Sequence, residues 1–272
     1  MTLAEPQVRP VAPAAPPAAR RGRRVVTRAA LGLVVPALLV VVWHLAATSG
    51  EFSPSQLPTP GAVLAALLEL IGRGELWRHI AISVQRVLIG FAVGGGVGLV
   101  LGGVIGLSAP LRALLAPTIQ ALRAVPSLAW VPLLLLWLGI GETPKITLVA
   151  IGAFFPVYTT VSAALAHVDH RLVEVGRAYG RSGVRLFLQV QLPAIAPGAL
   201  SGIRLGLAQG WLFLVAAELI ASSIGLGFLL IDSQNTGRTD ILLLAIVLLA
   251  LLGKATDGLL GLAERRLLRR WT

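Results

Sequence analysis

Residues 84–106, VQRVLIGFAVGGGVGLVLGGVIG, decide the fold class of this chain. The stretch is almost entirely apolar, and it is as long as the roughly 20 residues that a helix needs to cross the bilayer core. Glycine recurs at every fourth position from Gly90 to Gly106, which places five glycines on one stripe of a helix. Small residues on such a stripe let another helix approach closely within a membrane. We therefore predict a membrane-spanning helix that packs through its glycines.

A nucleotide-binding loop is the alternative explanation for this glycine-rich stretch. Residues 94–98 read Gly-Gly-Gly-Val-Gly, which lacks the third glycine of the dinucleotide fingerprint, and no strand precedes them. The chain also has no GxxxxGK[ST] loop, because its one Gly-Lys pair, at 253–254, is followed by Ala255. We therefore expect no cofactor in this chain, and any ATP hydrolysis must occur on another chain.

Five further apolar runs are long enough to be transmembrane helices, and they cover residues 29–48, 117–138, 146–167, 199–221 and 241–262. The composition agrees with this, since 56% of the residues are hydrophobic and only 13% are charged. Soluble domains carry about 25% charged residues. The fold predicted for the chain is therefore all-α and membrane-integral, a bundle of six transmembrane helices.

The segments outside the core of the bundle differ in composition. Residues 1–28 are rich in Pro, Ala and Arg and predict a disordered cytoplasmic tail. The apolar run 29–48 is longer than the roughly 7–15 residues of a signal-peptide core, which favours a retained first helix. Residues 57–83 carry apolar side chains at helical spacing and predict an amphipathic external segment. The transmembrane core would then be residues 84–262, followed by a basic cytoplasmic C-terminus, 263–272.

Lys and Arg residues outside the predicted spans orient the bundle. With the N-terminus in the cytoplasm, 15 of these residues lie in cytoplasmic segments. Four lie in extracytoplasmic segments, namely Arg73, Arg78, Lys145 and Arg238. This bias predicts that both termini are cytoplasmic. The net charge of +11 is therefore explained by topology, because the arginines flank apolar runs instead of forming a solvated face for nucleic acid.

Neither cysteine chemistry nor a metal site is expected. The chain has no cysteine, which excludes disulfides and thiolate ligands. Its four histidines do not cluster as ligands do, and His167 and His170 are better explained as a solvated helix end.

The segment 168–198, between the fourth and fifth predicted spans, holds the most informative motif. It contains EVGRAYG at 174–180, then nine residues, then VQLP at 190–193. Leu172, Val175 and Tyr179 have helical spacing, so a short helix that ends at Gly180 is predicted. On the residues alone, a surface helix that holds its arginines in water and a helix that docks on a partner remain equally open.

This spacing resembles the EAA loop of ABC importer permeases, in which Glu-Ala-Ala, three residues, Gly, nine residues, Ile, any residue and Leu-Pro follow one another. Val175 and Gly176 replace the two alanines, and Val190 replaces the isoleucine. In that family the loop forms a coupling helix that docks on the ATPase subunit. The resemblance therefore implies a coupling role for Glu174, Gly176, Arg177, Tyr179, Gly180, Leu192 and Pro193.

Further motifs are similar to the aliphatic sulfonate branch of these permeases, which also includes taurine and nitrate transporters. They are LRAVP at 122–126, LAWVP at 128–132, WLGIGE at 137–142, FFPVY at 154–158 and AELI at 217–220. The resemblance implies a type I importer permease in the bacterial inner membrane. It also implies a second permease copy, two ATPase subunits, an extracytoplasmic binding protein and contact with lipid. The cargo would be a small organic anion such as an alkanesulfonate, with taurine, nitrate or another small solute as alternatives. A membrane-embedded enzyme would need a convergent catalytic set, which the sequence lacks, and a channel would need no coupling loop.

Polar side chains within the predicted spans are the candidates for the translocation pathway or gate. They are Gln120, Arg123, Ser127, Thr159, Thr160, Gln209 and Glu218. Charged residues at membrane depth are costly and often functional, but each polar group could instead make an interhelical hydrogen bond. We expect Lys254 and Asp257 to form a structural pair and Arg204 to extend toward the membrane surface.

Overall fold

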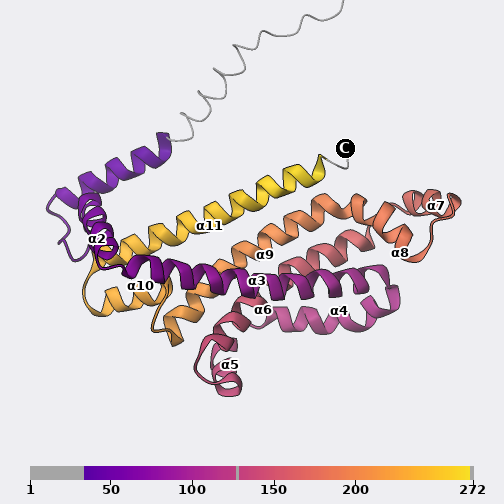
Figure 1. Ribbon diagram of the computed structural model, residues 1–272, viewed down its shortest axis with the longest axis horizontal. Coiled ribbons are helices and arrows are strands. Elements are labelled where there is room, and N and C mark those ends of the chain that lie inside the picture. The colour runs from indigo at the N-terminus through magenta and orange to yellow at the C-terminus, as the bar shows by residue number, and fades with distance from the viewer. Residues whose placement is uncertain (1–33, 127–128, 270–272) are drawn as a thin grey trace, which may run out of the picture. The chain divides into compact units, whose positions relative to one another are not determined.

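The computed structural model describes residues 34–126 and 129–269, and all regular structure within these ranges is helical (Figure 1). The chain divides into two units, residues 1–60 and 61–272. The described part of the first unit contains one helix, Val34–Thr48. In this unit the Trp43 indole Nε1–H donates to the Pro58 carbonyl over 2.9 Å. Residues 29–33 of the predicted first span and the predicted tail 1–28 lie outside the described residues.

The second unit holds the remaining helices, which follow one another along the chain with few long connections. They are α2 (Pro60–Gly72), α3 (Glu75–Leu107), α4 (Ala109–Ala124), α5 (Trp130–Leu138), α6 (Glu142–Ala166), α7 (His170–Ala178), α8 (Gly183–Leu186), the π-helical turn η2 (Phe187–Gln191), α9 (Leu192–Ala221), α10 (Leu226–Asn235) and α11 (Thr239–Leu268). Four helical stretches of the described chain are long and apolar enough to cross a membrane: α3, α6, the run Gly183–Ile220 and α11. They correspond to the predicted second, fourth, fifth and sixth spans, and they contain all but the last residue of the fourth and of the fifth.

The predicted third span, 117–138, is wrong as a single helix. The chain instead forms α4 and α5, which are separated by a break beginning at Val125. Pro126 explains the break, because a proline disfavours the α conformation in the residue before it. Val125 accordingly has an extended backbone, with φ −66° and ψ 124°.

The helix that contains the predicted second span begins earlier than predicted, directly after a glycine. The segment 57–83, expected as one amphipathic unit, contains the whole of α2 and the first turns of α3. Gly74 separates the two helices with φ +71°, a left-handed conformation that glycine adopts without a Cβ penalty. The spanning helix α3 therefore begins at Glu75, and it is 33 residues long.

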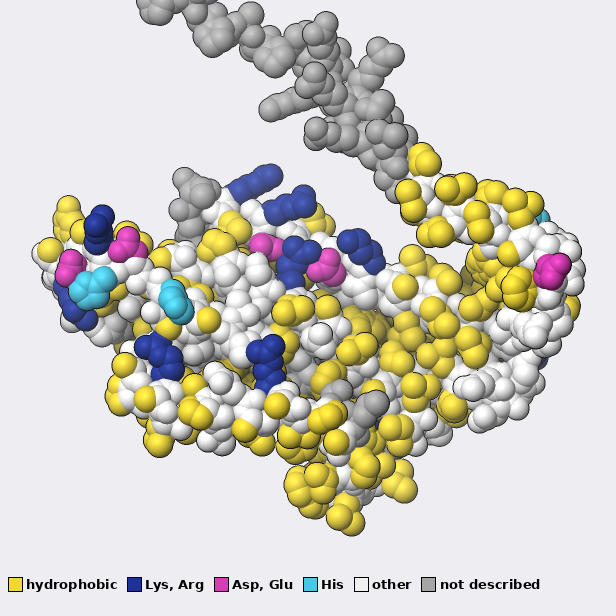
Figure 2. Space-filling view, turned by 180° about the vertical axis from the view of Figure 1, so that it is seen from behind, with side chains coloured by type: hydrophobic (Ala, Val, Ile, Leu, Met, Phe, Trp, Pro, Cys, Tyr) yellow, Lys and Arg dark blue, Asp and Glu magenta, His cyan; other side chains and the backbone are white. Residues whose placement is uncertain are grey.

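Three helices, α3, α6 and α9, form the core of the second unit. Val87 of α3, Val149 of α6 and Leu214 of α9 meet in one buried cluster. A second cluster joins α6 and α9 through Val157, Ile195 and their neighbours. The outer surfaces remain apolar, and Figure 2 shows hydrophobic side chains over much of the helical face. Large side chains such as Val100, Leu136, Leu212 and Leu251 are exposed there, as is expected of helices that face lipid.

The glycine stripe of α3 packs on α6, as its spacing predicts. A Cβ at Gly90 would lie 2.6 Å from the Val149 Cβ, and one at Gly98 would lie 2.9 Å from the Phe154 carbonyl oxygen. A Cβ at Gly94 would overlap the carbonyl group of Ala150. Gly96, on the other side of the same helix, has open space around it. The stripe therefore sets the close distance between the two helices.

Gly94→Ala and Gly96→Ala form a matched pair that tests this packing. The added methyl group at Gly94 meets backbone atoms, which cannot rotate away. We therefore expect the free energy of unfolding to fall by about 1–3 kcal/mol. The same methyl group at Gly96 meets nothing and should be neutral or slightly stabilising. Thermal denaturation of the detergent-solubilised variants measures the difference, and equal melting temperatures would contradict the packing.

Candidate functional site

The predicted coupling loop lies at the end of the bundle where α6 ends and α9 begins (Figure 1). Asp169 caps α7 by accepting a hydrogen bond from the Arg171 backbone N–H over 2.9 Å. After α7 the chain turns at Gly180, with φ +72°. It then returns through α8 and η2 to α9. The π-helical turn ends at Gln191, two residues before Pro193, whose missing N–H interrupts regular α-helical bonding.

The two glycines of this loop have different roles. A Cβ at Gly176 would lie 2.6 Å from Leu186 Cδ1 and 3.1 Å from Val190 Cγ2, so this glycine lets α7 lie close against α8 and η2. A Cβ at Gly180 would meet nothing within 4 Å. Gly180 is therefore required for its left-handed backbone, not for a close contact.

The remaining coupling candidates divide between an outer and an inner face. The Glu174 carboxylate is 62% exposed, and its Oε1 lies 3.1 Å from His170 Nδ1. Arg177 is exposed, and Tyr179 is 81% exposed. Leu192 instead packs against the buried cluster of α6 and α9. The loop thus presents Glu174, Arg177 and Tyr179 outward while its inner side chains hold it on the bundle.

A pocket of about 370 Å³ lies farther along the bundle, between the end of α4, the start of α5, α6 and α9. It brings together three of the predicted pathway residues, Arg123, Thr159 and Gln209. The Thr159 hydroxyl donates to the Phe155 carbonyl over 2.7 Å. The other described lining residues are Ala124, Val125, Pro126, Trp130, Ile151, Gly152, Phe155, Pro156, Leu205 and Phe213.

The other predicted pathway residues lie elsewhere. Thr160 packs against α9 at Gly202 and donates to the Pro156 carbonyl over 2.8 Å. Gln120 is exposed on α4 and does not line this pocket. Ser127 lies outside the described residues. Glu218 is fully buried in a network of polar contacts, so it does not face the pocket.

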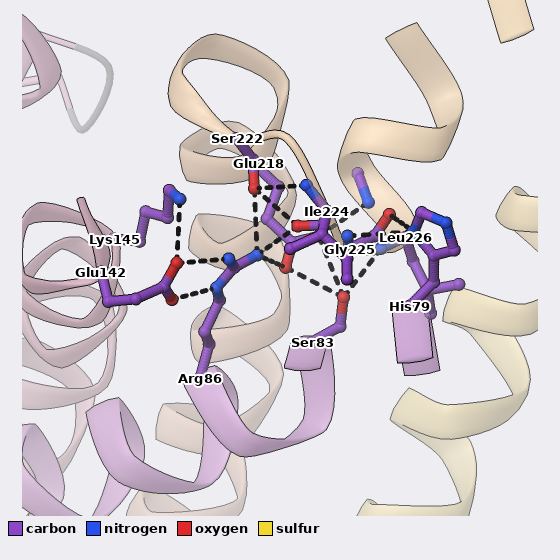
Figure 3. A network of polar contacts seen from close by, with 11 residues as sticks. His79, Ser83, Arg86, Glu142, Lys145, Glu218, Ser222, Ile224, Gly225 and Leu226 are labelled. Atoms are coloured by element: carbon purple, nitrogen blue, oxygen red, sulfur yellow. Dashed lines mark hydrogen bonds and ion pairs between the residues drawn. The ribbon is translucent and has the colours of Figure 1, made fainter. Parts of the chain in front are cut away.

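Arg86 of α3 is the centre of that network (Figure 3). Its side chain is 2% exposed, and its guanidinium binds two carboxylates from different helices. Nη1 donates to Glu218 Oε1 of α9 over 2.7 Å, and Nε and Nη2 donate to the two Glu142 oxygens of α6, each over 2.6 Å. Lys145 lies 3.1 Å from Glu142 Oε1. One cation therefore ties three core helices together at the end of the bundle remote from the coupling loop.

Glu218 also organises the connection between α9 and α10. It accepts hydrogen bonds from the Ser83 hydroxyl over 2.9 Å and from the Gly227 backbone N–H over 2.7 Å. Ser83 accepts in turn from the Leu226 N–H, and His79 Nδ1 lies 3.1 Å from the Gly225 N. A Cβ at Gly225 would overlap the Glu218 carboxylate, so this connection can lie on the network only with glycine at that position.

Arg86 is a functional residue that the sequence patterns alone did not identify. Its position in the sequence does indicate a polar contact, because an arginine inside a long apolar run requires a partner. Its partners lie 56 and 132 positions later in the chain, so periodicity within one helix cannot identify them.

A second ion-pair group connects α9 with α11. The Arg204 guanidinium binds both Asp257 oxygens, over 2.8 and 2.9 Å, and Nη1 lies 3.2 Å from Glu264. The expected Lys254–Asp257 pair is only a 4.0 Å contact, with Lys254 84% exposed. Arg204 therefore does not extend freely toward the membrane surface as expected; it is the main partner of Asp257.

A third group connects α2 with the turn before α11. Arg238 Nη2 lies 2.8 Å from Glu69 and 2.9 Å from Asp240. Hydrogen bonds from Arg238 lower the pKa of the Glu69 carboxyl below its ordinary value. The two carboxylates, Asp240 first, raise the pKa of Arg238. Both effects keep this group charged at neutral pH.

The described chain thus combines spanning core helices, packed closely through glycines, with a helical loop between α6 and α9. Residues 94–269 match the family described as binding-protein-dependent transport system inner membrane component, and the chain belongs to this family. It is a membrane-spanning transport subunit and not an enzyme.

Its relatives include named sulfonate permeases, which confirms the resemblance drawn from the motifs. The chain is 45% identical over 235 residues to the putative aliphatic sulfonates transport permease protein SsuC of Escherichia coli, covering 86% of this chain and 89% of that one. It is 41% identical over 238 residues to the SsuC protein of Bacillus subtilis, covering 88% and 86%. The taurine transport system permease protein TauC of E. coli is 37% identical over 241 residues, covering 87% and 86%.

The fold is also similar to a solved structure of the MetNI methionine ABC transporter in inward-facing conformations. The alignment covers 76% of this chain and 98% of that one, with a TM-score of 0.57 and 23% sequence identity. The likeness confirms the all-α importer permease fold.

Proposed function

We propose that this chain is the subunit through which an ABC importer carries an alkanesulfonate across the bacterial inner membrane. The observation that carries this cargo is the similarity to two SsuC proteins, at 41% and 45% identity over most of each chain. The taurine permease, at 37%, makes taurine the second candidate.

The energy comes from ATP bound to separate subunits, because this chain has no phosphate-binding loop. Two ATPase subunits, a second copy of this permease and an extracytoplasmic binding protein complete the transporter, and lipid surrounds the exposed apolar faces. Both termini are cytoplasmic, as the distribution of Lys and Arg favours.

The coupling loop transmits movement of the ATPase to the helices. Its outer face, with Glu174, Arg177 and Tyr179, docks on the ATPase. Its inner face is held by Leu186 and Val190 against Gly176, so a displacement of α7 passes to both α6 and α9. Alternating access to the two sides of the membrane follows from the movement of these helices, and no bond of the cargo is broken.

Uptake measurements in cells without their own sulfonate importers test the cargo. The chain is expressed with its cognate ATPase and binding protein, and labelled ethanesulfonate and taurine are offered separately. We expect ethanesulfonate uptake to exceed taurine uptake. Uptake of taurine alone would favour the second candidate, and uptake of neither would contradict the proposal.

A further inference from the structure

The pocket between α4, α5, α6 and α9 contains an arginine with no partner. Arg123 has no ion pair or hydrogen bond among residues 34–126 and 129–269, and it is the one charged side chain among the described lining residues. By contrast, Arg86, Arg204 and Arg238 each bind two carboxylates. These three arginines are thus neutralised by carboxylates, whereas the exposed Arg123 side chain borders an open volume without such a partner in the described part of the chain.

The pocket lies at the middle of the spanning helices, not at their ends. Its α6 residues run from Ile151 to Thr159 within a helix of residues 142–166. Its α9 residues run from Leu205 to Phe213 within a helix of residues 192–221. A cation at this depth is costly unless an anion compensates it.

The remaining lining suits an anion that carries an alkyl group. The Gln209 amide makes no hydrogen bond within the described residues, so its N–H groups can donate to a ligand. Trp130, Phe155 and Phe213 supply apolar walls. The volume of about 370 Å³ falls within the roughly 300–1,000 Å³ of small-molecule sites.

We propose that this pocket is the anion site of the membrane path, where Arg123 and Gln209 bind a sulfonate head group and the aromatic walls hold its alkyl chain. A planar guanidinium can donate two parallel hydrogen bonds to a sulfonate, which favours this head group over neutral solutes. The inference deepens the proposed function and rests on it for the cargo. The alternatives are a helix-end cation that stabilises α4 and an arginine that extends to the membrane surface.

Cysteine labelling tests the site without requiring transport. Since the chain has no cysteine, Thr159→Cys introduces a single thiol into the pocket. Full-length protein in membrane vesicles is treated with anionic sulfonatoethyl methanethiosulfonate or the cationic trimethylammonioethyl reagent. Each labelling rate is divided by the rate with a free thiol in solution. We expect the corrected rate of the anionic reagent to exceed that of the cationic reagent by about tenfold or more, and ethanesulfonate should slow the labelling.

The faster labelling by the anionic reagent must depend on Arg123. Arg123→Gln in the Thr159→Cys background should bring the rate ratio close to one, and Arg123→Lys should retain part of it. Arg112→Gln is the matched control on the same helix and should leave the ratio unchanged; Arg112 donates to the Gly106 carbonyl over 3.3 Å, away from the pocket. A ratio near one with Arg123 present, a ratio unaffected by Arg123→Gln, or no labelling by either reagent would overturn the inference.

Uptake separates this inference from the cargo assignment. In the assembled transporter, Arg123→Gln should reduce ethanesulfonate uptake at least about tenfold, while Arg112→Gln should transport normally. Equal uptake by the two variants would contradict the site. If the unaltered transporter moves no sulfonate but the anionic reagent still labels faster, the cargo assignment is wrong and the anion site is supported.

Discussion

Arg86→Ala is expected to destabilise the protein by about 3–5 kcal/mol, the cost of leaving a buried carboxylate without its partner. Glu218 is fully buried and loses its 2.7 Å ion pair, and Glu142 loses two hydrogen bonds of 2.6 Å. Arg86 joins α3 to α6, to α9 and to the connection 222–225 that leads to α10. The amount of folded protein after detergent extraction and its melting temperature measure the loss.

Arg78→Ala is the matched control, because Arg78 lies on the same helix and is exposed. It should change stability by less than about 0.5 kcal/mol. A second comparison uses Arg86→Met together with Glu218→Gln, which removes both opposed charges. We expect this double variant to lose less stability than the sum of the single variants, since groups in contact are not additive. Arg86→Ala with the stability of Arg78→Ala would show that the network does not hold the helices.

Gly180→Asp is expected to abolish uptake while the protein remains inserted and folded. An aspartate side chain at this position has space, but it lies beside the exposed face of α7 that we propose docks on the ATPase, and φ +72° strains any residue with a Cβ. Glu174→Lys should have the same effect by reversing a charge on that face. Membrane abundance, retention of the ATPase subunit on purification and ethanesulfonate uptake are measured together.

Gly237→Asp controls for backbone strain. Gly237 has φ +70° and also has open space, but it lies between α10 and α11, at the other end of the bundle. Strain alone would therefore impair both variants equally, whereas loss of ATPase docking affects only Gly180→Asp. Normal uptake and normal ATPase retention in Gly180→Asp and Glu174→Lys would refute the coupling role.

Local patterns predicted much of this architecture. The four-residue glycine period of α3 predicts that this helix packs closely through its glycines, and the helical spacing of Leu172, Val175 and Tyr179 predicts a short helix that ends at Gly180. These features depend on residues close in the sequence. The break at Val125 was missed because the apolar run continues through it, although Pro126 marks the position.

The polar sites were predicted only in part. Arg123, Thr159 and Gln209 were selected as polar residues in apolar runs, but only the crossing of α4, α6 and α9 brings them to one pocket. The same criterion selected Thr160 and Glu218, which make interhelical or buried contacts instead. A polar residue within a span therefore indicates a polar contact. Its position in the fold determines whether that contact is with another part of the protein or with the proposed cargo.

Transport in reconstituted vesicles tests whether this chain is an ATP-driven sulfonate permease. Vesicles contain this chain with its cognate ATPase, with ATP on the ATPase side and the binding protein with labelled ethanesulfonate on the other. We expect ethanesulfonate to accumulate on the ATPase side against its gradient, and omission of this chain, the ATPase or hydrolysable ATP should stop this accumulation. Accumulation that persists without ATP or without the ATPase, or no movement in the complete system, would contradict the assignment as an ATP-driven sulfonate permease.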